Sequence, residues 1–201
     1  MDSDGYLSQL ADIFNGITVN TPSISAIIAI ALAGVLLLAS GFASASEIAF
    51  FSLSPSDRND IDERNHPSDD KISALLGDTE RLLATILITN NFVNVTIIML
   101  CNFFFMNVFV FHSPLAEFLI LTVILTFLLL LFGEIMPKIY SAQKTLAFCR
   151  FSAPGIYFLE KVFRPIATVL VRSTTFLNKH FVKKSHNISV DELSHALELT
   201  D

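Results

Sequence analysis

Three long stretches of this chain carry no charged side chain, and this feature restricts the fold more than any other. Residues 13–46, 82–116 and 118–133 contain no Asp, Glu, Lys or Arg. A charge-free apolar stretch of roughly 18 residues can cross the hydrocarbon core of a bilayer as a helix. The sequence therefore predicts an all-α membrane protein with three transmembrane helices. It excludes a disordered chain, a disulfide-rich secreted scaffold and an ordinary cytosolic enzyme.

The predicted spans run from about Ile24 to Phe51, from near Arg81 to about Phe105, and from about Leu115 to Phe132. Asp78 is the predicted N-cap of the second helix, because a carboxylate there can accept a hydrogen bond from a free N–H of the first turn. Together with their connections, the spans form a predicted transmembrane domain over residues 24–138.

The segment 139–184 is apolar but interrupted by basic residues, which makes a further span unfavourable. Its composition predicts amphipathic helices lying on the membrane surface as a juxtamembrane belt, with breaks at Pro154 and Pro165. Residues 185–201 are more polar, and we expect them to form a linker in which a short helix begins near Ser189.

The positions of the basic residues predict the orientation. All 13 lie in or at the edge of the loop between the first two spans, or from Lys138 onward. By the positive-inside rule, the loop 54–80 and the carboxy-terminal segment are cytoplasmic, and residues 1–23 are outside. The net charge of −6, without a dense basic patch, excludes a nucleic-acid-binding module. Cys101 and Cys149 are predicted on opposite sides of the membrane, as buried small side chains without a disulfide.

Polar residues interrupt the first two spans, where each needs a physical reason. Ser40, Ser44 and Glu47 are spaced to share one helix face, and Asn90 and Asn94 share another, with the intervening asparagine pointing about 100° away. A packing seam of small residues explains the first group equally, and hydrogen bonds between helices explain the second.

The third polar cluster surrounds a proline at the end of the third span. Pro137 has no N–H, so the carbonyl of Gly133 loses its helical partner and Pro137 is the predicted helix breaker. A freed carbonyl at membrane depth is tolerated where an ion or a cavity satisfies it, and Glu134 lies beside it. The alternative is a helix that ends at the interface, with Glu134 paired to Lys138.

All three clusters fall in the predicted cytoplasmic half of the membrane and supply only hard oxygen donors. Hydroxyl, amide, backbone carbonyl and carboxylate oxygens suit Mg²⁺, Ca²⁺ or Na⁺ and disfavour zinc or copper. Their shared depth predicts a cation site that draws ligands from three helices.

The phrases SGFASASEIAFFSLS, RLLATILITNNFVNV and FGEIMPKIY together resemble the transmembrane domain of the CNNM/CorC family, also called DUF21. The resemblance covers about residues 24–185. It implies a homodimeric Mg²⁺ transporter or exporter coupled to Na⁺, in which each protomer has three spans and a juxtamembrane belt. The FGEIMPKIY wording also fits a bacterial branch associated with gliding motility, which implies the bacterial inner membrane.

The resemblance also implies which residues surround the ion. Glu47 would be a nearby acidic group, Pro137 the helix breaker and Lys138 its cytoplasmic neighbour. Family members carry a cytoplasmic CBS module that binds nucleotide, so we expect residues 185–201 to lead toward a module absent from this sequence. The implied Mg²⁺ ligands are Ser40, Ser44, Asn90, Asn94, the Gly133 carbonyl and Glu134.

Two other functional classes remain. A non-transporting membrane scaffold, as an accessory of a gliding-motility or secretion machine, would use the same polar residues for packing and partner contacts. An intramembrane protease is disfavoured because a serine nucleophile needs a neighbouring base, and the sequence is not predicted to be an enzyme. All five histidines fall in predicted loops or in the tail, at His66, His112, His180, His186 and His195.

Overall fold

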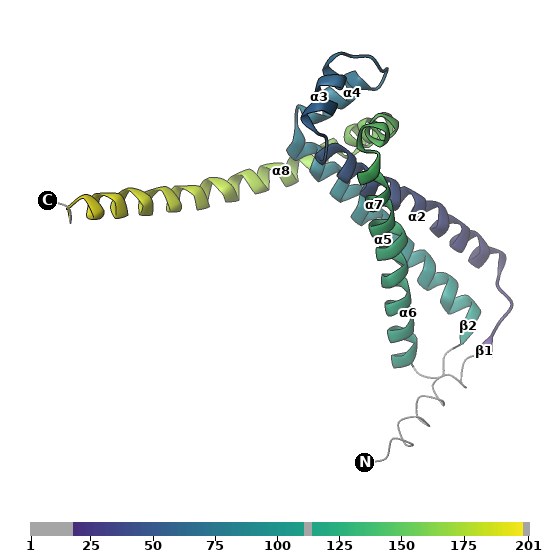
Figure 1. The fold of residues 1–201 in the computed structure, drawn as a ribbon. Helices are drawn as coiled ribbons and strands as arrows, with labels where there is room; N and C mark the ends of the chain where they lie inside the picture. The colour runs from purple at the N-terminus through teal and green to yellow at the C-terminus, as the bar shows by residue number, and fades with distance from the viewer. Residues whose placement is uncertain (1–17, 111–113, 199–201) are drawn as a thin grey trace.

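The computed structural model describes residues 18–110 and 114–198, and it describes side chains except at 114–116, 120 and from 174 onward. The chain is almost entirely helical (Figure 1). The elements in order are β1 (Thr18–Val19), α2 (Ile24–Phe51), α3 (Pro55–Asp62), α4 (Asp69–Leu76), α5 (Thr79–Val108), β2 (Phe109–Val110), α6 (Pro114–Leu128), the π-helix η1 (Leu129–Ile135), α7 (Met136–Gln143) and α8 (Thr145–Glu198).

Three helical segments of the described chain are long and apolar enough to cross a membrane: α2, α5 and the continuous run Glu117–Gln143. The all-α membrane fold is therefore confirmed. The α2 helix has the predicted bounds. The α5 helix begins next to the predicted N-cap, and the Asp78 carboxylate accepts the Arg81 N–H at 3.1 Å.

The third span continues past the predicted end near Phe132, and the prediction of a simple break at Pro137 is wrong. The chain stays helical through η1 and α7. The Met136 N–H donates to the Leu131 carbonyl five residues back, which is the hydrogen bond of a π-helix. Pro137 lies in the first positions of α7, where a missing N–H costs little. The proline is thus accommodated by a π-helical segment immediately before it.

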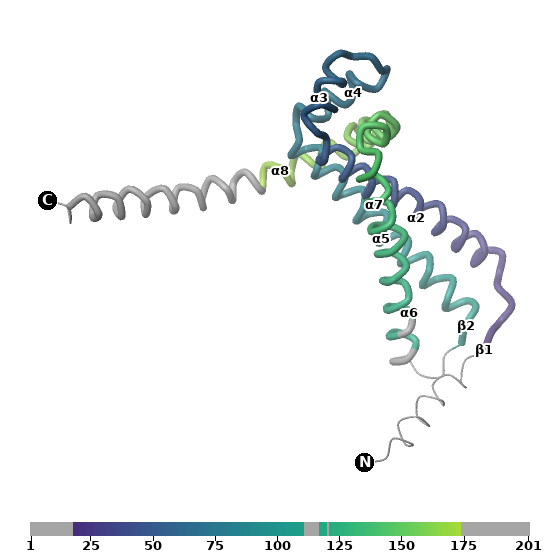
Figure 2. The backbone as a smooth tube through the Cα atoms, viewed as in Figure 1, coloured from purple at the N-terminus to yellow at the C-terminus, as the bar shows by residue number. Residues whose placement is uncertain are grey.

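The juxtamembrane segment is one helix after α7, not a series of helices separated by prolines. Pro154 and Pro165 lie inside α8, and no separate helix begins near Ser189. The first turns of α8 are seen nearly end-on beside α3 and α4, whereas the coloured turns that follow, before residue 174, cross the view, so the helix changes direction (Figures 1 and 2). A proline removes one hydrogen bond and can bend a helix without ending it.

The loop 54–80 is folded into two short helices, which we did not predict. The Ser54 hydroxyl accepts the Asp57 N–H at 3.1 Å, and the Asp57 carboxylate accepts the Ser54 N–H at 2.9 Å. This reciprocal pair is a capping box, followed by Pro55 at the start of α3. At the opposite end of the bundle, the short strands β1 and β2 pair antiparallel (Figure 1).

The α2 helix is the centre of the bundle and contacts α5, η1, α7 and α8. One apolar cluster lies where α2 meets α4, α5 and α8, and a second lies deeper between α2, α5 and the third span. Cys149 and Cys101 belong to these two clusters and are free thiols, which confirms the prediction of buried small side chains. Burial raises the pKa of the Cys149 thiol to about 12.

A buried ion pair fixes α8 to the α3–α4 hairpin. The Asp69 side chain is fully buried and accepts Arg150 Nε at 2.9 Å and Nη2 at 3.0 Å. Its second oxygen also accepts the His66 N–H at 2.9 Å. Burial alone would raise the pKa of Asp69. The hydrogen bonds and the guanidinium charge outweigh it, so the pKa lies below 3.8.

This lowered pKa makes the clasp sensitive to acid. Because the folded state holds the Asp69 carboxylate more strongly than the unfolded chain does, the stabilisation is present above pH 3.8 and is lost as the pH falls below it through the folded pKa. We expect the gap in melting temperature between wild type and Asp69→Asn to be widest near neutral pH and to close below pH 4. A gap that stays constant down to pH 3 would contradict this expectation.

Candidate functional site

The hydroxyl of Ser40 joins the first two spans at the middle of the candidate site. Ser40 is fully buried on α2, and its Oγ donates to Asn90 Oδ1 at 2.8 Å and lies 2.7 Å from Asn94 Oδ1. The two asparagines are one turn apart on α5, so both amides face α2. Asn91 faces away, is exposed, and donates to the carbonyl of Leu87 on its own helix.

The third span reaches the same point through two glycines. A methyl group built on Gly133 would lie 3.2 Å from Ser40 Oγ, a tight contact that Ser40 would have to relieve by a small shift, so the glycine favours the close approach of η1. A methyl group built on Gly41 would lie 3.0 Å from Cγ of Pro137 and 3.4 Å from the carbonyl oxygen of Phe132. The backbone of η1 and the start of α7 therefore pack directly against the small-residue face of α2.

Two buried hydroxyls of this helix pair have no hydrogen-bond partner among the described residues. They are Ser44 Oγ on α2 and Thr85 Oγ1 on α5, and both side chains are fully buried. Thr89 instead donates to the carbonyl of Thr85 at 2.8 Å. An unpaired polar group in an apolar interior is costly, so these oxygens are suited to accept a partner from outside the chain.

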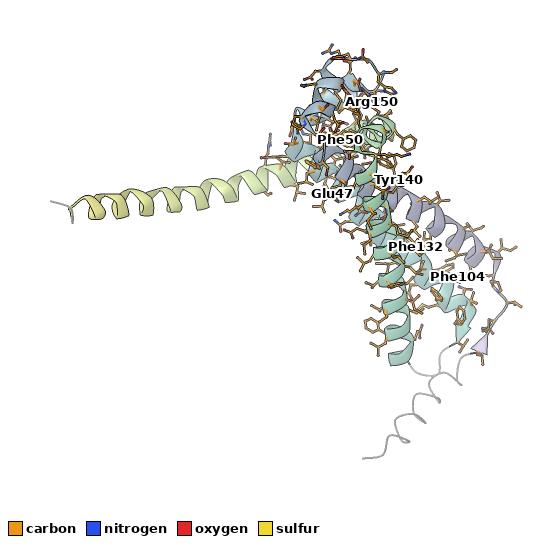
Figure 3. The ribbon with its side chains drawn as sticks, in the orientation of Figure 1. Glu47, Phe50, Phe104, Phe132, Tyr140 and Arg150 are labelled. Carbon is orange, nitrogen blue, oxygen red and sulfur yellow. The ribbon has the colours of Figure 1, made fainter. Side chains whose placement is uncertain are left out.

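The acidic residues of the candidate site share one lysine. Lys138 Nζ lies 3.1 Å from Glu134 Oε1 and 3.2 Å from Glu47 Oε2. The pairing of Glu134 with Lys138, four residues later, is the one expected if the third helix simply ends at the membrane interface. The pairing of Lys138 with Glu47 joins α7 to α2. Figure 3 places Glu47 toward the end of the bundle that carries Arg150, away from Phe104. This is the predicted cytoplasmic end.

A further contact fastens α7 to α2 one turn beyond Pro137. The Ser141 hydroxyl is fully buried and donates to the Ala45 carbonyl at 2.6 Å. We did not predict this residue or Thr85. The signal for each was a lone hydroxyl in an apolar segment, which is also the pattern of an ordinary helix seam.

The structure thus brings four of the predicted residues to one place: the side chains of Ser40, Asn90 and Asn94, with the backbone of Gly133 beside them. Ser44 follows one turn along α2, and its hydroxyl has no partner in the part of the chain that the structure describes. Glu134 is engaged by Lys138. Grouped neutral oxygens beside a carboxylate can replace water around a hard cation, whereas the same atoms can also fix three helices together.

The sequence matches a known family over most of its length. The family described as "Cyclin M transmembrane N-terminal domain" matches residues 31–201. That range includes α2 from residue 31 onward, the other two spans, every residue of the candidate site and α8.

Two curated relatives are similar over about two thirds of the chain. A UPF0053 protein of Synechocystis is 26% identical over 140 residues, which are 70% of this chain and 39% of the relative. A UPF0053 protein of Haemophilus influenzae is 29% identical over 136 residues, which are 68% of this chain and 31% of the relative. The match therefore spans less than half the length of either relative.

Proposed function

Because this chain belongs to the cyclin M transmembrane domain family, we propose that it is the membrane domain of a divalent-cation transporter whose cargo is Mg²⁺. The observation that carries the proposal is the position of Ser40 between the amide oxygens of Asn90 and Asn94, beside the backbone of Gly133. Three helices meet there and place hydroxyl and amide oxygens close together, and Mg²⁺ prefers oxygen ligands.

The donor set also suggests how the ion is held. Mg²⁺ normally keeps several of its waters, so a site built from neutral oxygens and one carboxylate binds it with modest affinity. The ligands in this proposal are Ser40, Ser44, Asn90, Asn94, the Gly133 carbonyl and Glu134. The unpartnered hydroxyl of Ser44 supports the assignment, because a ligand would satisfy it.

Movement of the third span would then change access to the ion. Its π-helical segment η1 supplies Gly133 and Glu134 and lies between the α-helices α6 and α7. Such segments are often found at functional sites. We propose that Na⁺ influx drives the exchange, that the chain acts as a homodimer in the bacterial inner membrane, and that its amino terminus is outside.

The test compares two asparagines on one helix. With the chain purified in detergent, we expect Mg²⁺ to raise the melting temperature of the wild type and of Asn91→Ala, but not of Asn94→Ala. Asn91 is the matched control because its side chain is exposed and bonds to the Leu87 carbonyl of its own helix. In liposomes loaded with a Mg²⁺-sensitive dye, we expect Na⁺-dependent Mg²⁺ flux with the wild type and with Asn91→Ala, but not with Asn94→Ala. An unchanged Mg²⁺ response in Asn94→Ala would remove the site.

One observation favours a second function. The polar groups of Ser40, Asn90 and Asn94 bond to one another, and Lys138 balances Glu134, as in a seam that only holds helices together. A non-transporting scaffold of a motility or secretion machine would use such a seam. Co-purification with partner proteins, together with no response of the wild type to Mg²⁺, would support this function.

A further inference from the structure

Lys138 is held between carboxylates that belong to different helices. Its Nζ lies 3.1 Å from Glu134 Oε1 on η1 and 3.2 Å from Glu47 Oε2 on α2. The lysine side chain is only 26% exposed, and the two carboxylates are 39% and 35% exposed. An ammonium group has three N–H donors, so it can serve both carboxylates at once.

This ion pair adjoins the oxygen atoms of the candidate site. Glu134 directly follows Gly133, the residue that packs against the Ser40 hydroxyl. Lys138 directly follows Pro137, which packs against Gly41 one residue beyond Ser40. If the Lys138 ammonium shifts from Glu134 toward Glu47, it therefore shifts along the contact between the third span and α2.

The charges make one carboxylate unavailable in this arrangement. The cluster holds two carboxylates and one ammonium, so its net charge is −1. The Glu134 oxygen that contacts Lys138 is not free to bind a second cation closely, because the two positive charges would repel. Glu47 is an alternative partner for the ammonium, because its Oε2 already lies 3.2 Å from Lys138 Nζ.

We propose that Lys138 is a positioning residue that competes with the transported cation for Glu134. Without the cation it bridges Glu134 and Glu47; when the cation takes Glu134, Lys138 stays on Glu47 alone. The competition lowers the affinity for the cation and helps its release. This inference rests on the proposed function, because it concerns the same site.

A purely mechanical role for the lysine predicts a different result. If Lys138 only clamps α7 to α2, removing either end of the clamp loosens the site, and both changes weaken cation binding. If Lys138 competes, the two changes act in opposite directions. Lys138→Gln removes the competitor and tightens binding, whereas Glu47→Gln leaves Lys138 with Glu134 alone and weakens binding.

The experiment is a Mg²⁺ titration of the purified chain in detergent at constant ionic strength, with melting temperature as the readout. We expect Lys138→Gln to lower the apparent Kd for Mg²⁺ by about tenfold, the effect of one modest charge interaction. Lys138→Arg keeps the competing charge and should stay within about threefold of wild type. Lys144→Gln, an exposed lysine at the end of α7, is the matched control and should bind as wild type does.

The double variant separates competition from a general loss of negative charge. Competition predicts that Glu47→Gln weakens Mg²⁺ binding in the wild type but has little effect in the Lys138→Gln background, because no lysine remains to be redirected. A general charge effect predicts equal weakening in both. Equal weakening, or an unchanged or higher Kd in Lys138→Gln, overturns the inference and leaves the proposed function intact. If wild type and Lys144→Gln both ignore Mg²⁺, the proposed function fails and the inference fails with it.

Discussion

Asp69→Ala is expected to lower the free energy of unfolding by about 3–5 kcal/mol, the usual cost of removing one partner from a buried ion pair. Asp69 is fully buried, and its two oxygens accept both hydrogen bonds from Arg150 and one from the His66 backbone. Removing the carboxylate leaves the mostly buried guanidinium without its main partner. It also removes the ion pair that links α8 to the α3–α4 hairpin.

The neighbouring aspartate gives the control for this prediction. Asp70 pairs with Arg64 on the surface, where both side chains are more than 70% exposed, so Asp70→Ala should cost at most about 1 kcal/mol. Thermal melting by circular dichroism measures both variants. Alkylation of Cys149 gives a second readout, because this thiol is buried next to Arg150 and reacts only when the cluster opens. Equal losses in the two variants would contradict the assignment of Asp69 as the fastening residue.

Gly41→Val is the second large effect that we expect, with a loss of about 1–3 kcal/mol and of the Mg²⁺ response. The first added carbon would lie 3.0 Å from Pro137 and 3.4 Å from the Phe132 carbonyl, which is a backbone atom and cannot turn away. The third span would have to move off α2. That shift would separate Gly133 from Ser40 and Lys138 from Glu47.

A second glycine on α2 tests the reason for the effect. Gly34 lies seven residues earlier on the same helix, and a carbon added there meets no atom within 4 Å. Gly34→Val therefore changes helix propensity equally but should keep both the melting temperature and the response to Mg²⁺. If the two valine variants behave alike, close approach of the helices is not what Gly41 provides.

The spans could be predicted from sequence because each is set by local composition. The charge-free stretch 13–46 indicated the first span, whose predicted bounds of about Ile24 to Phe51 agree with α2, and the capping carboxylate of Asp78 marked the start of α5. The position of Ser40 opposite Asn90 and Asn94 was also within reach, since polar residues at one depth of a membrane tend to meet.

The rest depended on tertiary contacts that composition does not encode. Pro137, Pro154 and Pro165 were interpreted as breaks because a proline removes a hydrogen bond, yet the chain remains helical at all three. The α3–α4 hairpin was missed because both helices are short and polar, and the capping box at Ser54 was the local signal for the first of them. The link from Lys138 to Glu47 joins residues 91 positions apart, and only the packing of α7 on α2 brings them together.

The Ser40 hydroxyl has fewer hydrogens to donate than it has amide oxygens around it. A serine hydroxyl carries a single hydrogen, yet two amide oxygens stand within bonding distance of it. At any instant one of those oxygens is left with an unshared electron pair facing inward, and rotation of the hydroxyl only exchanges which one. In the proposed function a bound cation would be a partner for that oxygen, because a cation accepts an electron pair and brings no hydrogen of its own.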